Sequence, residues 1–112
     1  MPEAAKSIKK IKVKWDQFIK MKRRKFTDDY KIISEIGRGG FGCVYRVMMK
    51  TGKIYRAAKK IAKDQLKQEE HESLLAEMAI MKSLDHPNIT KLFEVYDQKS
   101  FYVMVLELCE GG

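Results

Sequence analysis

Eight consecutive residues of this chain form the pattern Gly-x-Gly-x-x-Gly-x-Val, and their types could hold the phosphates of a nucleotide. They are Gly37, Arg38, Gly39, Gly40, Phe41, Gly42, Cys43 and Val44. Glycine has no Cβ, so it adopts backbone conformations that other residues avoid and lets backbone N–H groups approach phosphate oxygens. Glycine clusters also occur in ordinary hairpins, so the flanking sequence must decide between a phosphate loop and a simple turn.

Two other glycine-rich phosphate sites do not fit this sequence. The dinucleotide-binding fold needs a helix that starts at the last glycine and an acidic residue about 20 positions later. Residues 43–49 follow the last glycine instead, and their β-branched, aromatic and apolar side chains predict a strand. A loop of the Walker type ends in Gly-Lys-Ser/Thr, which Gly42-Cys43 does not provide. The pattern therefore predicts a strand, a tight loop and a second strand.

Lys59 and Glu77 are the charged residues that could complete such a site. Lys59 follows Val44 by fifteen positions on a predicted strand, which would place its ammonium group under the glycine loop. Glu77 falls between Leu74 and Met81 on the apolar side of a predicted helix. Leaving one member of a buried ion pair unmatched costs about 3–5 kcal/mol, so we expect Lys59 and Glu77 to pair. For either residue alone, an ordinary surface position is the alternative.

The elements that must position these residues follow from periodicity and turn signals. Strands are predicted near residues 30–36, 43–49, 54–61, 91–97 and 101–108, and a helix over 64–84 ends at the proline-containing turn 85–88. We therefore expect an α+β domain in which a five-stranded antiparallel sheet packs against one large helix.

Positive charge is confined to the first 25 residues. They hold ten Lys and Arg against two acids, a net charge of +8, whereas residues 26–112 hold thirteen of each sign and are neutral. Apolar residues recur at helical spacing from Ala4 to Lys25, which predicts a basic amphipathic helix as an extension before a domain of residues 26–112. Because the domain itself has no net positive charge, we expect no nucleic-acid partner.

Cysteine and histidine usage indicates no metal site. Cys43 and Cys109 are the two cysteines, with no Cys-x-x-Cys motif, and the two histidines lack metal-ligand spacing. We expect a reducing, cytoplasmic environment.

The sequence features and their order resemble those of the amino-terminal lobe of a eukaryotic Ser/Thr protein kinase. These features are, in order, a glycine loop, a valine, Ala-x-Lys on a strand, a helix glutamate, His86-Pro87-Asn88-Ile89 and two strands. The resemblance covers residues 30–112. It implies that the glycine loop covers the phosphates of ATP, and that Lys59 binds the α- and β-phosphates and pairs with Glu77.

The same resemblance implies the rest of the nucleotide site. Ile36, Val44 and Ala57 match positions that form the apolar adenine pocket, and Leu106 falls at the gatekeeper position of the hinge. The backbone carbonyl of Glu107 and the N–H of Cys109 would bind the adenine edge. Within the family, the hinge Glu-Leu-Cys-Glu-Gly-Gly looks most like the calcium/calmodulin-dependent group, particularly calcium-dependent protein kinases of plant and protist type.

The sequence ends before the positions of the family's catalytic loop and Asp-Phe-Gly magnesium site, and it has no EF-hand pattern. We therefore expect the ATP-binding half of a larger kinase, inactive alone, whose Mg²⁺ ligands lie elsewhere in the parent. The rival interpretation is a binding module in which the basic helix of residues 1–25 binds a calmodulin-like domain or an anionic membrane. A third possibility is that Trp15 and Phe18 simply pack on the lobe or on other parts of the parent.

Overall fold

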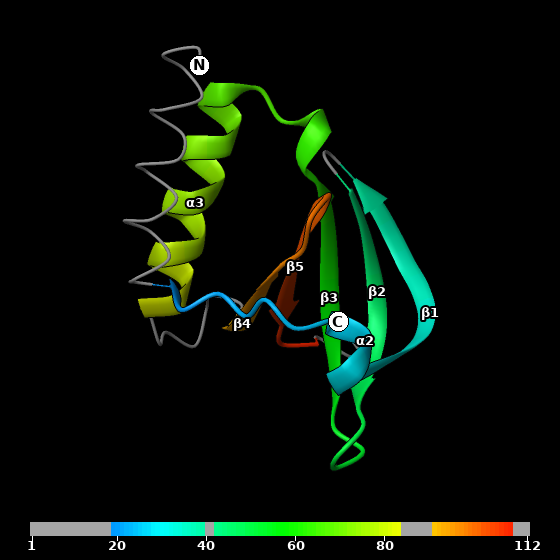
Figure 1. Ribbon diagram of the computed structural model, residues 1–112. Helices are drawn as coiled ribbons and strands as arrows, with labels where there is room; N and C mark the ends of the chain where they lie inside the picture. The colour runs from blue at the N-terminus through cyan, green and yellow to red at the C-terminus, as the bar shows by residue number, and fades with distance from the viewer. Residues whose placement is uncertain (1–18, 40–41, 84–90, 109–112) are drawn as a thin grey trace.

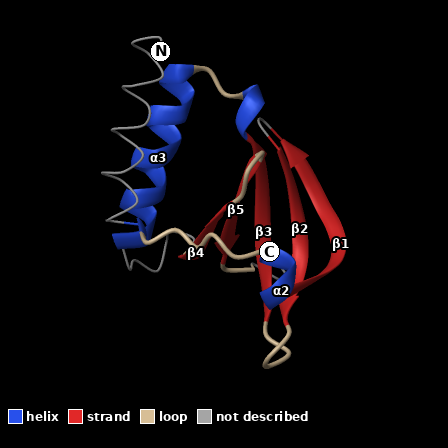
Figure 2. Ribbon diagram, viewed as in Figure 1, coloured by secondary structure: helices blue, strands red, loops and turns tan. Residues whose placement is uncertain are grey.

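The computed structural model describes residues 19–39, 42–83 and 91–108, which form a sheet and one long helix (Figures 1 and 2). In chain order the elements are α2 (Phe26–Asp29), β1 (Tyr30–Gly39), β2 (Gly42–Met49), β3 (Tyr55–Ala62), the short 3-10 helix η1 (Lys63–Gln65), α3 (Gln68–Ser83), β4 (Leu92–Asp97) and β5 (Phe101–Leu106). The predicted α+β class and five-stranded antiparallel sheet are confirmed.

The strands are ordered β1-β2-β3-β5-β4, and every neighbouring pair is antiparallel. The first three strands form a meander, because short turns connect them. The chain then leaves the sheet through α3 and returns with β4 at the far edge and β5 beside β3. This order puts β3 at the centre of the sheet, where it is paired on both sides.

The sheet has two distinct faces, because successive residues of a strand point to opposite sides. Ile61 of β3 lies in a core cluster with Leu75 and Met78 of α3. Ala58 lies in a second cluster with Phe26 of α2 and Tyr30. We call these the α3 face and the α2 face; Figure 1 shows the two helices on opposite sides of the sheet.

Helix α3 begins four residues later than predicted, at Gln68. The residues before it form η1 over Lys63–Gln65, followed by extended backbone at Leu66. Glu70 fixes the new start, since its Oε1 accepts a hydrogen bond from the backbone N–H of Lys67 at 3.0 Å. This is one half of a capping box, which satisfies a backbone donor that the helix itself cannot.

The end of the basic extension differs from the prediction. A helix was expected to reach Lys25, but residues 20–25 are not helical, and Lys20 has a φ of 58°. Residues 19–29, which we call the strap, instead run across the sheet edge, where Lys22 bridges Tyr96 of β4 in parallel. Ile19 and Met21 of the strap are buried in the α3-face core. The rest of the predicted basic helix, including Trp15 and Phe18, lies outside the described residues.

Candidate active site

The strand register places four of the predicted site residues on the α3 face. Val44 of β2 is paired with Lys59 of β3, and Lys59 is paired on its other side with Met104 of β5. Ala57 lies two residues before Lys59 and is paired with Leu106. Since directly opposed residues share a face, Val44, Ala57, Lys59 and Leu106 all lie on the side that carries α3.

Lys59 and Glu77 line one cavity of about 310 Å³ between β3 and α3. Ile61 and Leu74 supply apolar walls, and Glu69 and Glu70 from the first turn of α3 add two further carboxylates. The site therefore combines one half-buried ammonium group with several acids in a partly apolar cavity. An amine in this setting can bind an anionic ligand or pair with one of the carboxylates.

The predicted Lys59–Glu77 ion pair is not formed in this structure. Among the residues that the structure describes, no salt bridge or hydrogen bond joins the two side chains, and Glu77 is exposed. Glu77 faces the cavity from the helix without the burial that the prediction assumed. Because Glu77 is exposed, the free-energy cost of leaving its carboxylate without an ion-pair partner is small. The Lys59–Glu77 pair is therefore not required for folding.

The glycine loop lies where β1 turns into β2. Gly39 is paired with Gly42, so residues 40 and 41 connect the two strands. A Cβ placed on Gly42 would lie 1.7 Å from the carbonyl oxygen of Lys60, so this glycine is required by the close approach of β2 to β3. A Cβ on Gly37 would meet nothing within 4 Å. Gly40 and Phe41 of the predicted loop lie outside the described residues.

Of the remaining loop residues predicted to contact a nucleotide, Ile36 and Arg38 are exposed and Cys43 is half-buried. Ile36 retains 51% of its accessible surface. Arg38 donates a 2.7 Å hydrogen bond from Nε to Glu35 Oε1, and this bond lowers the pKa of Glu35. Cys43 is a half-buried free cysteine on the opposite, α2 face, since it is paired with Lys60.

At the hinge end, Leu106 closes β5 and is half-buried, while Glu107 is exposed. The backbone N–H of Glu107 donates to the carbonyl of Lys91 at 2.9 Å, which joins the ends of β4 and β5. The predicted roles for the Glu107 carbonyl and for Cys109 stay predictions, because Cys109 lies outside the described residues.

Comparison with known proteins identifies the family of this chain. The family model for the protein kinase domain matches residues 30–112. This chain belongs to the protein kinase domain family. It is also 39% identical over 87 residues to calcium-dependent protein kinase 3 of Plasmodium yoelii yoelii, and 39% identical over 97 residues to calcium-dependent protein kinase 5 of Plasmodium falciparum (isolate 3D7). The alignments cover 76% and 86% of this chain but only 16% and 17% of those relatives.

The predicted kinase amino-terminal lobe is thereby confirmed, and the five-stranded sheet and α3 are parts of this lobe. The described residues contain no group of three or more His, Cys, Asp or Glu side chains that could hold a metal ion. Over the same residues, no helix is long and apolar enough to cross a membrane.

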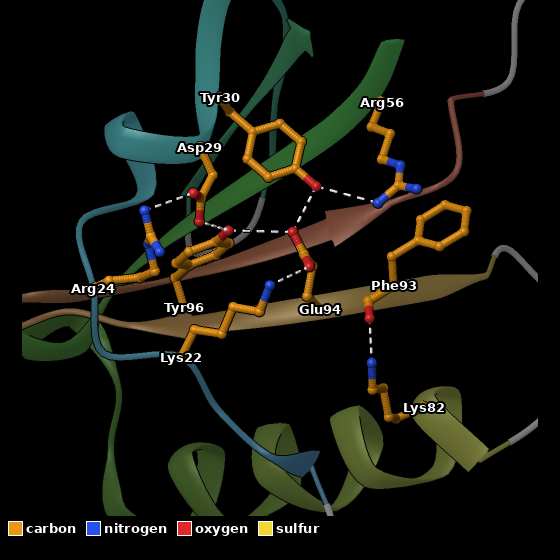
Figure 3. Close-up of polar contacts among 9 residues, drawn as sticks. All are labelled: Lys22, Arg24, Asp29, Tyr30, Arg56, Lys82, Phe93, Glu94 and Tyr96. Carbon is orange, nitrogen blue, oxygen red and sulfur yellow. Dashed lines mark hydrogen bonds and ion pairs between the residues drawn. The ribbon is translucent and has the colours of Figure 1, made fainter. Parts of the chain in front are cut away.

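A polar network on the kinase lobe was not predicted from the sequence (Figure 3). Its centre is Glu94 of β4, whose carboxylate accepts hydrogen bonds from Tyr30 at 2.5 Å, Lys22 at 2.8 Å and Tyr96 at 3.2 Å. Tyr96 also lies 2.6 Å from Asp29, which forms a 3.0 Å ion pair with Arg24. The network joins the strap to β4, so it fixes the edge of the sheet.

Lys82 of α3 adds a direct link between the helix and β4. Its Nζ donates to the carbonyl oxygen of Phe93, as Figure 3 shows. Burial lowers the pKa of Lys82, partly offset by the negative charge of Glu94. The only sequence signal for this contact is the position of Lys82 in the last turn of α3, one turn beyond the buried Met78.

Proposed function

We propose that residues 30–112 are the ATP-binding half of a Ser/Thr protein kinase, and that the longer protein transfers the γ-phosphoryl group of ATP to protein hydroxyls. The observation that carries this proposal is the pairing of Val44 with Lys59 on the α3 face, where Lys59 lines the same cavity as Glu77. Membership of the protein kinase family supports the use of ATP and Mg²⁺.

The residues present fit such a ligand. The Lys59 ammonium group is positioned to bind phosphate oxygens, and the apolar side chains of Val44, Ala57 and Leu106 are positioned to contact an adenine ring. Around Gly37 there is open space, which lets the loop backbone approach a ligand. When bound, ATP with Mg²⁺ supplies the phosphoryl group. Glu77 would hold the Lys59 ammonium in place once the two groups close together across their shared cavity.

Lys59→Met tests the nucleotide site, with its neighbour Lys60→Met as the matched control. The two lysines are adjacent on β3 but lie on opposite faces of the sheet. We expect Lys59→Met to weaken ATP binding at least about tenfold, since a hydrogen bond to a charged group contributes roughly 1.5–3 kcal/mol. Lys60→Met should leave the affinity unchanged. Equilibrium dialysis with radiolabelled ATP measures both, and equal losses in the two variants would refute the site.

We further propose that the 112 residues alone transfer no phosphoryl group, because the family's catalytic-loop and magnesium-binding residues follow the hinge in sequence. The same radiolabelled ATP with a generic protein substrate checks this point. Transfer clearly above that of the Lys59→Met variant would overturn it.

Calcium regulation of the longer protein is the finer part of the proposal. Its support is the similarity to relatives named calcium-dependent protein kinases. We expect phosphotransfer by the longer protein to rise on adding calcium and to fall on adding a chelator. Equal activity in calcium and in chelator would rule out this regulation while leaving the kinase assignment intact.

A further inference from the structure

The α2 face of the sheet carries a cavity of about 310 Å³ that the nucleotide site does not use. Its floor is formed by Ala58 and Val103, which are 1% and 3% exposed. Phe26 of α2 and the rings of Tyr45 and Phe101 surround this floor. The hollow exists because α2 is a single turn and covers only part of the face, and because Ala58 is small.

The rim of this cavity is positively charged. Among the described residues, Lys25 and Lys60 line it and no acidic residue does. The Nζ of Lys60 lies 4.2 Å from the centre of the Phe101 ring, so the cation lies beside the apolar opening. Both lysines are exposed.

A second, more open cavity of about 570 Å³ adjoins the first and shares Tyr45, Lys60 and Phe101 with it. Lys99 adds a further exposed cation there, and Asp64 is the one acid among the described residues that line it. Lys63 also lines this cavity, but its Nζ donates to Asp97 Oδ1 and to the Gln98 carbonyl. We call the two cavities together the α2-face groove.

We propose that the α2-face groove docks an acidic segment of a partner protein, with one apolar side chain in the Ala58–Val103 cavity and carboxylates beside Lys60, Lys25 and Lys99. The lysines around the groove would attract the carboxylates of an acidic peptide. The groove also joins an apolar cavity to a polar, cationic one, which suits a peptide that carries both apolar and acidic side chains. An acyl chain would need apolar walls along its length, whereas the second cavity is polar at Lys99, Ser100 and Asp64. The Ala58–Val103 cavity is separate from the Lys59 cavity, because Lys60 and Lys59 lie on opposite faces of the sheet. The second cavity borders the glycine loop, since Gly42 and Cys43 also line it.

Fluorescence anisotropy with a fluorescein-labelled peptide Glu-Glu-Phe-Glu-Glu tests the proposal on the 112-residue chain without ATP. We expect saturable binding that weakens as salt is raised, because exposed charges are screened. Replacing Phe by Ala in the peptide should weaken binding at least about fivefold, since the alanine would bury much less apolar surface in the Ala58–Val103 cavity. A Lys-Lys-Phe-Lys-Lys peptide should not bind.

Charge-reversal variants locate the peptide on the molecule. Lys60→Glu should weaken binding at least about fivefold, because it replaces attraction by repulsion beside the cavity. Lys31→Glu is the matched control, since Lys31 is an exposed lysine of β1 outside both cavities and should leave the affinity unchanged. Circular dichroism verifies that both variants are folded.

Three results would overturn the proposal. The first is no binding at millimolar peptide, and the second is equal losses in the Lys60 and Lys31 variants. The third is complete displacement of the peptide by sodium dodecanoate at lower concentration than the peptide itself, which would indicate a lipid site instead.

Discussion

Glu94 is the residue on which the strap and the sheet edge depend most directly. Its carboxylate accepts hydrogen bonds from Tyr30, Lys22 and Tyr96, while its side chain is only 18% exposed. Burial acts to raise the pKa of Glu94, but the hydrogen bonds from Lys22, Tyr30 and Tyr96 outweigh it, so the pKa lies below the usual value. Burial and the hydrogen bond to Glu94 also raise the pKa of Tyr30 above its usual value.

We predict that Glu94→Gln lowers the free energy of unfolding by about 1–2 kcal/mol at pH 7, because charged hydrogen bonds are lost and one partner, Lys22, is partly exposed. A carboxyl group with a lowered folded pKa stabilises the protein above its unfolded pKa, and this contribution is lost as the pH falls through the folded value. The difference between wild type and variant should therefore shrink below a pH of about 4.5. Urea unfolding of both proteins across pH 3–7 measures this difference in the free energy of unfolding.

Glu35→Gln is the control for this experiment, since Glu35 is an exposed carboxylate whose hydrogen-bond partner Arg38 is also exposed. It should change stability little at any pH. A Glu94→Gln loss that stayed constant down to pH 3 would contradict the assignment of the effect to the charge on Glu94.

Among single residues, the sequence predicts the position of Lys59 but not the role of Glu94. The spacing of Lys59, fifteen residues after Val44 on a strand predicted to run beside the glycine loop, is local information, and the structure pairs Lys59 with Val44 on the α3 face. Glu94 acquires its role from Lys22 and Tyr30, which are 72 and 64 positions away. No periodic pattern reports such a contact, because it depends on how two distant segments dock.

At the scale of elements, the strands were predicted well, whereas the start of α3 and the end of the basic helix were not. Strand β2 was expected over 43–49 and is observed over Gly42–Met49, since β-branched, aromatic and apolar residues follow the last glycine of the loop. The start of α3 was missed because Gln65, Leu66 and Lys67 are good helix formers, whereas the Glu70 cap to the Lys67 N–H places the start at Gln68.

The structure of the strap differs more from the prediction made from its local sequence than the start of α3 does. Ile19 belongs to the apolar spacing that predicts the basic helix, but Lys20 has a φ of 58° and residues 20–25 are not helical. There Lys22 gains two hydrogen bonds with β4: its N–H donates to the Val95 carbonyl at 2.8 Å, and its carbonyl accepts from the Asp97 N–H at 2.8 Å. Pairing with the unpaired edge of β4 satisfies backbone groups that would otherwise face solvent, so the tertiary contact overrides the helical pattern.

At the scale of the whole molecule, the strap connects both cores of the lobe. Ile19 and Met21 are buried on the α3 face with Leu75 and Met78, and Phe26 is buried on the α2 face. The phenylalanine ring stacks on Tyr30 with centroids 5.0 Å apart. Residues 19–29 precede the segment that the kinase family model matches, yet they contribute to both sides of its sheet.

We predict that the double variant Ile19→Ala/Met21→Ala loses several kcal/mol of stability, since truncating a buried Ile or Met to Ala typically costs about 2–5 kcal/mol. The loss should appear first at the β4 edge. In amide hydrogen exchange, the Asp97 N–H, which donates to Lys22, should exchange faster by a larger factor than the Ala58 N–H of the central strand. Ile54→Ala is the matched control, because Ile54 is 49% exposed and should cost little. Uniform acceleration of Asp97 and Ala58 would show instead that the strap stabilises the lobe only globally, without closing its edge.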